Sequence, residues 1–456
     1  MPDEPSRFPT INDRAPLPWV HLFRGFRIAV DFRKILVAGL GLLVLLLGDL
    51  AISWLPFSPP DAALGMGAGV ATDVADARAT FEGLALAPER PGEFGRRLGV
   101  HFAAVVRPWR MFVDRGSDLF RADTTATWGG VASAWTRILW LLIVTALFGG
   151  AIARMAAVQF ARDEKLGLWP ALRFAAARFP SFLTAPLLPM LGIGLLWAIC
   201  ALLGAAGWIP YAGPPALGAL WLVPLALGFV MTLILLGVSA GWPLMYATIG
   251  AEDSDAFDGF SRSYSYVFGR PWQYLGMALV AIVYGGLLVL FVAGVAFLVL
   301  HLSAAAVATG FGDANTAELL QGTTALIGVD APPGPPSGPL ALGSTLAGGW
   351  LSVVGLLVSG FAYSYFWTAA TIIYFLLRRI DDGTDLDEVQ LSDDAAADEL
   401  LPLVGVAASP QPVVERPAGG DAAASPTSAS TPPADSIPTG DTEFDIRDVP
   451  PTVSDD

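Results

Sequence analysis

Two long stretches of this chain contain no charged residue, and they constrain the fold more than any other feature. No Asp, Glu, Lys or Arg occurs in the 73 residues at 179–251 or in the 47 residues at 331–377. A bilayer core about 30 Å thick is crossed by about 20 apolar residues in a helix, so the first stretch is long enough for two membrane spans. Charged residues make up only 15% of the chain, against about 25% in soluble domains. These features predict a polytopic membrane protein.

Hydropathy along the chain predicts an all-α fold, a polytopic membrane helix bundle. The six expected spans are residues 35–57, 132–153, 182–207, 216–240, 274–302 and 346–377. They define a membrane domain at residues 35–377, after an N-terminal segment at 1–34 and before a tail at 378–456. In the N-terminal segment, apolar residues recur at helical spacing opposite basic ones, which predicts an amphipathic interfacial helix along the membrane surface. A helix packed against another loop is the alternative.

The distribution of Lys and Arg predicts the orientation of the spans. Six basic residues precede the first span, five lie between the second and third, and Arg378 and Arg379 follow the sixth, whereas residues 208–215 and 303–344 contain none. By the positive-inside rule, both termini are cytoplasmic and the loops at 58–131 and 303–345 are external. The first external loop is expected to carry a surface helix around residues 93–106, with a re-entrant element as the alternative.

Most of the formal charge of −15 belongs to the tail. Residues 378–456 contain 18 acidic and 4 basic residues, so the rest of the chain is close to neutral. Beyond residue 402 the tail is rich in Ala, Pro, Ser and Thr and too poor in large apolar residues to fold alone, which predicts disorder. The expected partners are membrane lipid and, through this tail, a protein. A nucleic acid is not expected, and the oligomeric state stays open.

The motifs of common active sites and metal sites do not occur in the sequence. It has no Walker loop, HExxH or GxSxG pattern, and it has one cysteine and three widely separated histidines. We therefore expect no catalytic residue, no cofactor and no metal site, and an enzyme is not the expected class.

One carboxylate is expected inside a span. Asp49 lies five residues before Trp54 at the end of the first span, and Arg137 lies about as far into the second. A charge at the bilayer centre costs about 2.5–3.5 kcal/mol on insertion scales, and pairing with an opposite charge offsets part of this cost. The sequence predicts a structural Asp49–Arg137 pair. Snorkelling of both side chains to the outer surface is the alternative.

Small residues form a seam along the sixth span. They recur at spacings of 4, 3, 4 and 3, at Gly348, Ser352, Gly355, Ser359 and Ala362. Because small side chains let two helix backbones come close, the seam is expected to pack against another helix, within the chain or in a homodimer.

A second amphipathic helix is predicted between the fourth and fifth spans. Phe257, Phe260 and Tyr264 recur at spacings of three and four, and Arg262 follows Asp258 at the i,i+4 distance that favours an ion pair. We expect this interfacial helix on the cytoplasmic surface, with its aromatic side chains among the lipid headgroups.

Three stretches of the chain carry a resemblance to a known group. FGGAIARMAA at 148–157, RFAAARFPSF at 173–182 and SRSYSYVFGRP at 261–271 together resemble uncharacterised multi-pass proteins of planctomycete-type bacteria. The resemblance covers residues 19–390. It implies a location in the bacterial cytoplasmic (inner) membrane, and it implies no activity.

The expected function is a non-catalytic membrane scaffold or assembly protein that acts through its surface helices and tail. The alternative is a transporter or channel for a neutral or lipid-like solute. Prolines at 186, 189 and 224 are expected to interrupt the third and fourth spans, and broken spans support the transporter. The absence of charge from these two spans disfavours an ion or proton pathway through them.

Overall fold

A computed structural model describes residues 18–57, 64–84, 91–121, 127–321, 336–386 and 389. The regular elements of these residues are all helices, which confirms the all-α fold class. Most of the tail at 378–456, including the part predicted to be disordered, lies outside the described residues.

Six helices, or runs of helices, are long and apolar enough to cross a membrane, so the chain is an integral membrane protein. They are α2 (Phe32–Ser53), α7 to α8 (Trp128–Arg162), α10 with a final 3₁₀ turn (Phe179–Trp208), α12 (Leu222–Glu252), α14 (Pro271–Phe311) and α17 (Pro339–Asp382). Each of these overlaps one predicted span. Within the second span, one π-helical turn at Thr145–Gly149 joins α7 (Trp128–Val144) to α8 (Gly150–Arg162).

The predicted interruptions of the third and fourth spans are not found. The helix α10, whose regular part is Phe179–Ala205, runs through Pro186 and Pro189, and Pro224 lies in the first turn of α12, where a proline displaces no hydrogen bond. The fourth span also starts later than expected, because Pro214 and Pro215 begin a separate short helix, α11 (Gly213–Ala219).

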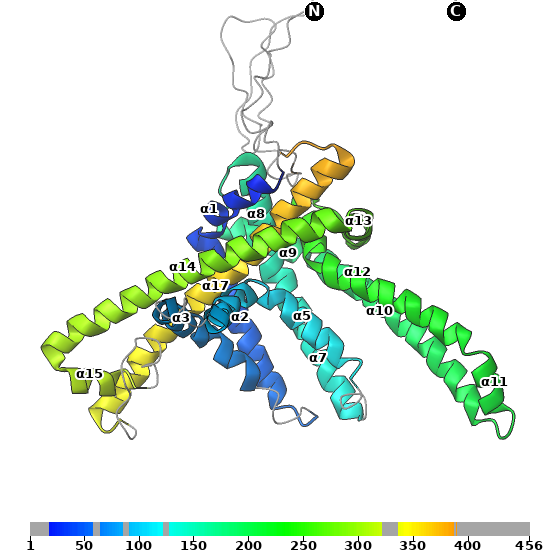
Figure 1. Ribbon diagram of the computed structural model, residues 1–456, viewed down its shortest axis with the longest axis horizontal. Helices are drawn as coiled ribbons and strands as arrows, with labels where there is room; N and C mark the ends of the chain where they lie inside the picture. The colour runs from blue at the N-terminus through cyan, green and yellow to red at the C-terminus, as the bar shows by residue number, and fades with distance from the viewer. Residues whose placement is uncertain are drawn as a thin grey trace, which may run out of the picture. The chain divides into compact units, whose positions relative to one another are not determined.

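Span α17 lies at the centre of the bundle and contacts α2, α8, α12 and α14. Figure 1 shows α10 and α12 running side by side, with α11 between their far ends. We call the end of the bundle where α12 and α17 finish the inner end, because the charge pattern predicts that it is cytoplasmic. The opposite end is the outer end.

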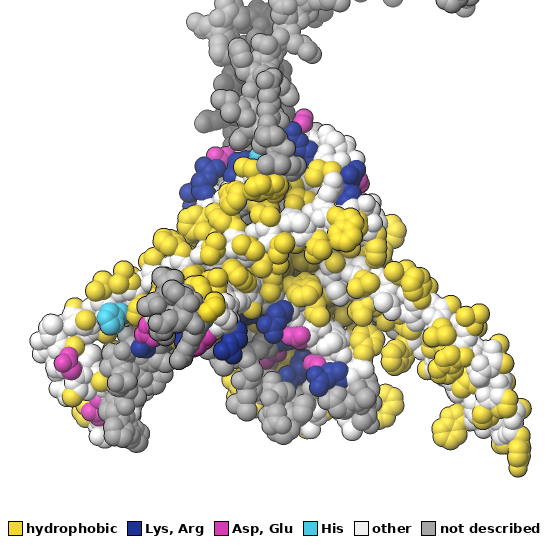
Figure 2. Space-filling model, viewed as in Figure 1, with side chains coloured by type: hydrophobic (Ala, Val, Ile, Leu, Met, Phe, Trp, Pro, Cys, Tyr) yellow, Lys and Arg dark blue, Asp and Glu magenta, His cyan; other side chains and the backbone are white. Residues whose placement is uncertain are grey.

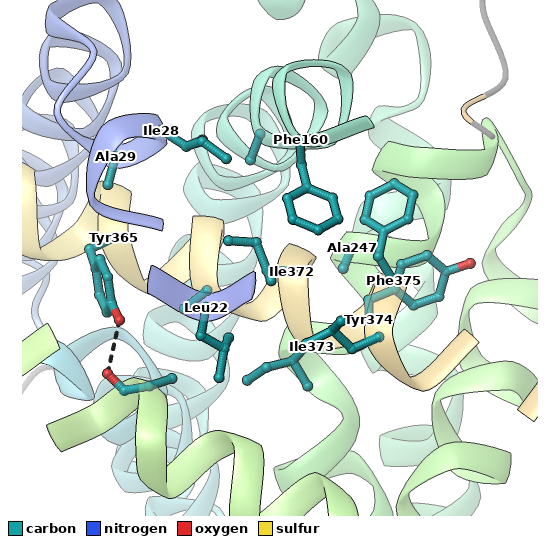
Figure 3. Close-up of a cluster of buried hydrophobic side chains, with 14 of the residues drawn as sticks. Leu22, Ile28, Ala29, Phe160, Ala247, Tyr365, Ile372, Ile373, Tyr374 and Phe375 are labelled. Atoms are coloured by element: carbon teal, nitrogen blue, oxygen red, sulfur yellow. Dashed lines mark hydrogen bonds between the residues drawn. The ribbon is translucent and has the colours of Figure 1, made fainter. Parts of the chain in front are cut away.

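A large apolar cluster fills the bundle towards the inner end (Figure 3). Ile372 and Phe375 of α17 meet Phe160 of α8, and Leu22 and Ile28 of the N-terminal segment reach the same cluster. That segment is a 3₁₀ turn (Pro18–Arg24) followed by α1 (Gly25–Ala29). Its apolar residues are thus divided between the core and the surface, since Phe23 and Val30 stay exposed.

Ion pairs join the helices at the inner end. The carboxylate of Glu252, at the end of α12, forms ion pairs with the guanidinium groups of Arg262 at 2.8 Å and Arg378 at 3.2 Å. The carboxylate of the neighbouring Asp253 pairs with Arg178 at 2.5 Å. Tyr374 also donates a hydrogen bond to Glu252. These contacts join the inner end of α12 to the start of α10, to α13 and to α17.

The predicted interfacial helix is α13 (Ala256–Gly269), but most of its aromatic face is turned inward. Tyr264 packs on Gly237 of α12, where an added Cβ would lie 2.3 Å from its ring, and its hydroxyl donates to the Ile234 carbonyl at 2.6 Å. Phe260 packs partly against the core, and Phe257 is exposed. The helix therefore folds back along α12, with only part of its aromatic face available to headgroups.

The seam on α17 is buried over its inner half. Gly355, Ser359 and Ala362 are buried, Gly348 is half-buried and Ser352 is exposed. A close backbone approach on this helix lies at a residue outside the predicted seam.

That residue is Gly360, which packs against α2. A Cβ at Gly360 would lie 3.0 Å from the carbonyl oxygen of Ile35 and 3.1 Å from the amide nitrogen of Gly39. Because both of these are backbone atoms, they cannot rotate away.

We predict that Gly360→Leu lowers the unfolding temperature of the purified protein strongly, because overpacking of a tight contact costs about 1–3 kcal/mol or more. Gly349→Leu on the same helix is the control, since nothing lies within 4 Å of its Cβ position. The measurement is thermal unfolding in mild detergent. Equal effects of the two substitutions would contradict the close α2–α17 contact.

Candidate functional site

The segment between the first and second spans is folded into the bundle. It contains α3 (Leu64–Leu84), α4 (Pro91–Val105) and α5 (Arg107–Asp118), and α3 and α4 pack against α14 (Figure 1). Phe81 of α3 and Phe102 of α4 cover Gly294 and Gly286 of α14, where added Cβ atoms would lie 2.5 and 1.8 Å from their rings. The helix expected around residues 93–106 is present as α4, with one face packed against the bundle.

A buried ion pair fixes the start of α5. Both oxygens of Asp73 in α3 accept from the Arg107 guanidinium, at 2.5 and 3.1 Å. Ser359 of α17 donates to the same carboxylate at 2.6 Å. Asp73 is only 1% exposed, so this bidentate pair replaces the water that the carboxylate would otherwise need. Ser359 thus has a polar partner as well as a place in the predicted seam.

A second polar contact links α3 and α4 beside this pair. The Thr80 hydroxyl lies 3.0 Å from Nε2 of His101. Burial lowers the pKa of His101, although the nearby Asp73 opposes this shift, and burial raises the pKa of the half-buried Asp76. The imidazole of His101 is therefore mainly neutral at pH 7.

A second buried ion pair fixes the other end of α5. The Arg115 guanidinium contacts Oδ2 of Asp49 in α2 at 2.7 Å and donates to the carbonyl of Arg137 in α7 at 3.0 Å. Arg137 itself donates from Nε to Ser133 at 3.3 Å. Asp49 thus forms its ion pair with Arg115. The sequence had predicted Arg137 as the partner. The guanidinium of Arg115 lies beside Arg137 and joins α2, α5 and α7 in one contact.

A different face of α5 packs on α12 through aromatic rings. Phe112 stacks on Trp242 with ring centroids 4.4 Å apart, and both residues are at most 2% exposed. The Trp109 indole donates to the Ser239 carbonyl at 2.7 Å. Contacts with α2, α3, α7, α12 and α17 therefore hold α5 as a rigid wall inside the bundle.

This wall borders a lateral groove, which we define as the cavity between α5 and α7 on one side and α10 and α12 on the other. Its volume is about 860 Å³, within the range of about 300–1,000 Å³ that is typical of ligand sites. Aromatic rings are prominent in its lining, at Phe112, Phe120, Trp128, Trp135 and Trp197. Hydroxyl groups in the lining come from Ser117, Thr127 and Ser239.

No group of His, Cys, Asp or Glu side chains among the described residues has the arrangement of a metal site. The groove offers shape and apolar contact instead of reactive groups. The sequence did not single out α5 or the groove, because the residues that build them are distributed over four segments far apart in the chain.

No family model, no curated protein and no solved structure matches this chain. The resemblance to planctomycete-type membrane proteins therefore stays a prediction, and the description of the site depends on its own geometry.

We predict a strong energetic coupling between Asp49 and Arg115. Asp49→Asn and Arg115→Met should each destabilise the protein by about 3–5 kcal/mol, because each leaves a buried group without its partner. The double variant should lose clearly less free energy of unfolding than the sum of the losses of the two single variants. The measurement is a double-mutant cycle on unfolding in detergent, with Asp49→Asn and Arg137→Met as the comparison cycle. A larger coupling in the Arg137 cycle would restore the pairing that the sequence predicted.

Proposed function

We propose that this protein binds a lipid or lipid-like solute that enters the lateral groove sideways from the bilayer, as the first step of its transport. The observation that carries the proposal is the groove itself, about 860 Å³ in volume and lined mostly by apolar side chains from two pairs of helices. A cavity of this size and lining fits an acyl chain better than an ion or a polar metabolite.

The surroundings of the groove support entry from the membrane. On α10, Leu191, Leu195 and Leu202 are between 65% and 74% exposed, and α12 exposes Leu222 and Phe229 to a similar extent. In an integral membrane protein such surfaces face acyl chains. The apolar outer surfaces of α10 and α12 therefore support entry of a lipid tail from their side of the groove.

The scaffold function, which the sequence placed first, depends mainly on the tail at 378–456. That tail lies almost entirely outside the described residues, so the proposed function is based on the groove. The proposal includes no catalytic step. It retains the bacterial cytoplasmic membrane and cytoplasmic termini as proposals, supported by the distribution of Lys and Arg.

A substitution in the groove tests the proposal. Gly194 of α10 lines the groove, and nothing lies within 4 Å of its Cβ position. Gly194→Phe should fill space that a lipid tail would occupy and lower the affinity for a tail-labelled phospholipid at least about tenfold, or about 1.4 kcal/mol. The measurement is fluorescence anisotropy with delipidated protein in mild detergent.

Gly192→Phe is the matched control, since Gly192 lies on the same helix with equal space around it but does not line the groove. Both variants should unfold at nearly the same temperature as the wild type. If Gly194→Phe binds the lipid as tightly as Gly192→Phe does, the groove is not the binding site.

A further inference from the structure

The helix α5 carries two kinds of charged residue. Arg107 and Arg115 point into the bundle, and each has a carboxylate from another helix. Arg110 and Asp114 are exposed instead and lie one turn apart. With the exposed Ser117, they form a polar edge next to the face that Val113 and Gly116 present to the groove. Figure 2 shows charged side chains gathered over α5 and the adjoining part of α7, between apolar surfaces.

Arg110 and Asp114 make no ion pair with each other or with any other described residue. Their spacing would allow one, since the i,i+4 pair Arg78–Glu82 closes at 2.7 Å with the same order of charges. Neither side chain lines the groove itself, but each lies one helical turn before a residue that does, Val113 for Arg110 and Ser117 for Asp114, so a headgroup at the edge of the groove can reach both.

The depth of these residues fits contact with a lipid headgroup. Trp109, next to Arg110, contacts Ser239, which lies 17 residues along α12 from its outer start at Leu222. At 1.5 Å per residue this is about 25 Å, most of the thickness of a bilayer core of about 30 Å. Arg110 therefore lies near the inner boundary of the core, close to the predicted end of the fourth span at residue 240, at a level where lipid headgroups begin.

We infer that Arg110 and Asp114 bind the headgroup of a zwitterionic phospholipid that carries a phosphate and a primary ammonium group, while its tail occupies the groove. A guanidinium is well suited to a phosphate, with which it forms charge-assisted, bidentate hydrogen bonds. The Asp114 carboxylate accepts hydrogen bonds from an ammonium N–H, which a quaternary ammonium lacks. The headgroup thereby matches both charges at once. This inference depends on the lipid-binding function proposed above.

The test compares three phospholipids with identical labelled tails, namely phosphatidylethanolamine, phosphatidylcholine and phosphatidylglycerol, by anisotropy with the full chain in mild detergent. The wild type should bind phosphatidylethanolamine about tenfold more tightly than either of the others. Arg110→Gln should weaken binding of all three lipids. Asp114→Asn should reduce the affinity for phosphatidylethanolamine to nearly that for phosphatidylcholine, because phosphatidylethanolamine alone loses hydrogen bonds from its ammonium N–H groups to the carboxylate.

Arg96→Gln is the control, because Arg96 is an exposed arginine of α4 that does not line the groove. Equal binding of the three lipids by the wild type, or tightest binding of phosphatidylglycerol, would overturn the inference. So would unchanged headgroup preference in both α5 variants when their unfolding temperatures match the wild type. If Gly194→Phe still weakens binding in that case, the groove remains the tail site and only the headgroup assignment fails.

Discussion

Two buried arginine–carboxylate pairs on α5 determine what this bundle can do. Two arginines of α5, an amphipathic helix too short to cross the membrane, pair with carboxylates of other helices. Arg107 pairs with Asp73 of α3, and Arg115 pairs with Asp49 of α2. Breaking such a pair strands a charge in a region of low dielectric, which is far more costly than losing a surface ion pair. The pairs therefore hold α5 among the spans, and the position of α5 in turn creates one side of the groove.

Aromatic side chains connect the helices around the groove. Phe112 stacks on Trp242, and Trp242 lies edge-to-face on Trp367 of α17 with centroids 5.2 Å apart. This stack links α5, α12 and α17, and Phe112 also lines the groove. The rings of Phe120, just after α5, and of Trp197 in α10 line the groove as well, with centroids 5.8 Å apart. Aromatic rings therefore connect the helices on the two sides of the groove.

The sequence predicted the helical class and the six spans because both follow from local hydropathy. It predicted Asp49 as an intramembrane charge for the same reason, but it did not identify the partner. Arg115 lies between the first two predicted spans, in a segment that the sequence analysis assigned to an external loop. Only the tertiary packing brings its side chain to α2. Glycines in the fifth span were a usable signal, since Gly286 and Gly294 are the positions that Phe102 and Phe81 cover.

The groove itself was beyond prediction from one sequence, because its walls come from α5, α7, α10 and α12 and depend on how these helices cross. The prolines of the third span suggested a transport path because they were expected to break the helix. The structure does not support this reason, since α10 is continuous through them. The polar edge of α5 was also hidden. Arg110 and Asp114 have the spacing of an ordinary helical ion pair, and only the structure leaves them apart.

The most direct test of this account is whether α5 touches α12 in the membrane. In a Cys200→Ser background, Trp109→Cys and Ser239→Cys place thiols at two contacting residues. A short bismaleimide added to intact membranes should link this pair efficiently. It should fail to link Trp109→Cys to Gly228→Cys, which lies about three turns nearer the outer start of α12. Equal or absent linking of the two pairs would contradict the packing of α5 on α12 and the groove that depends on it.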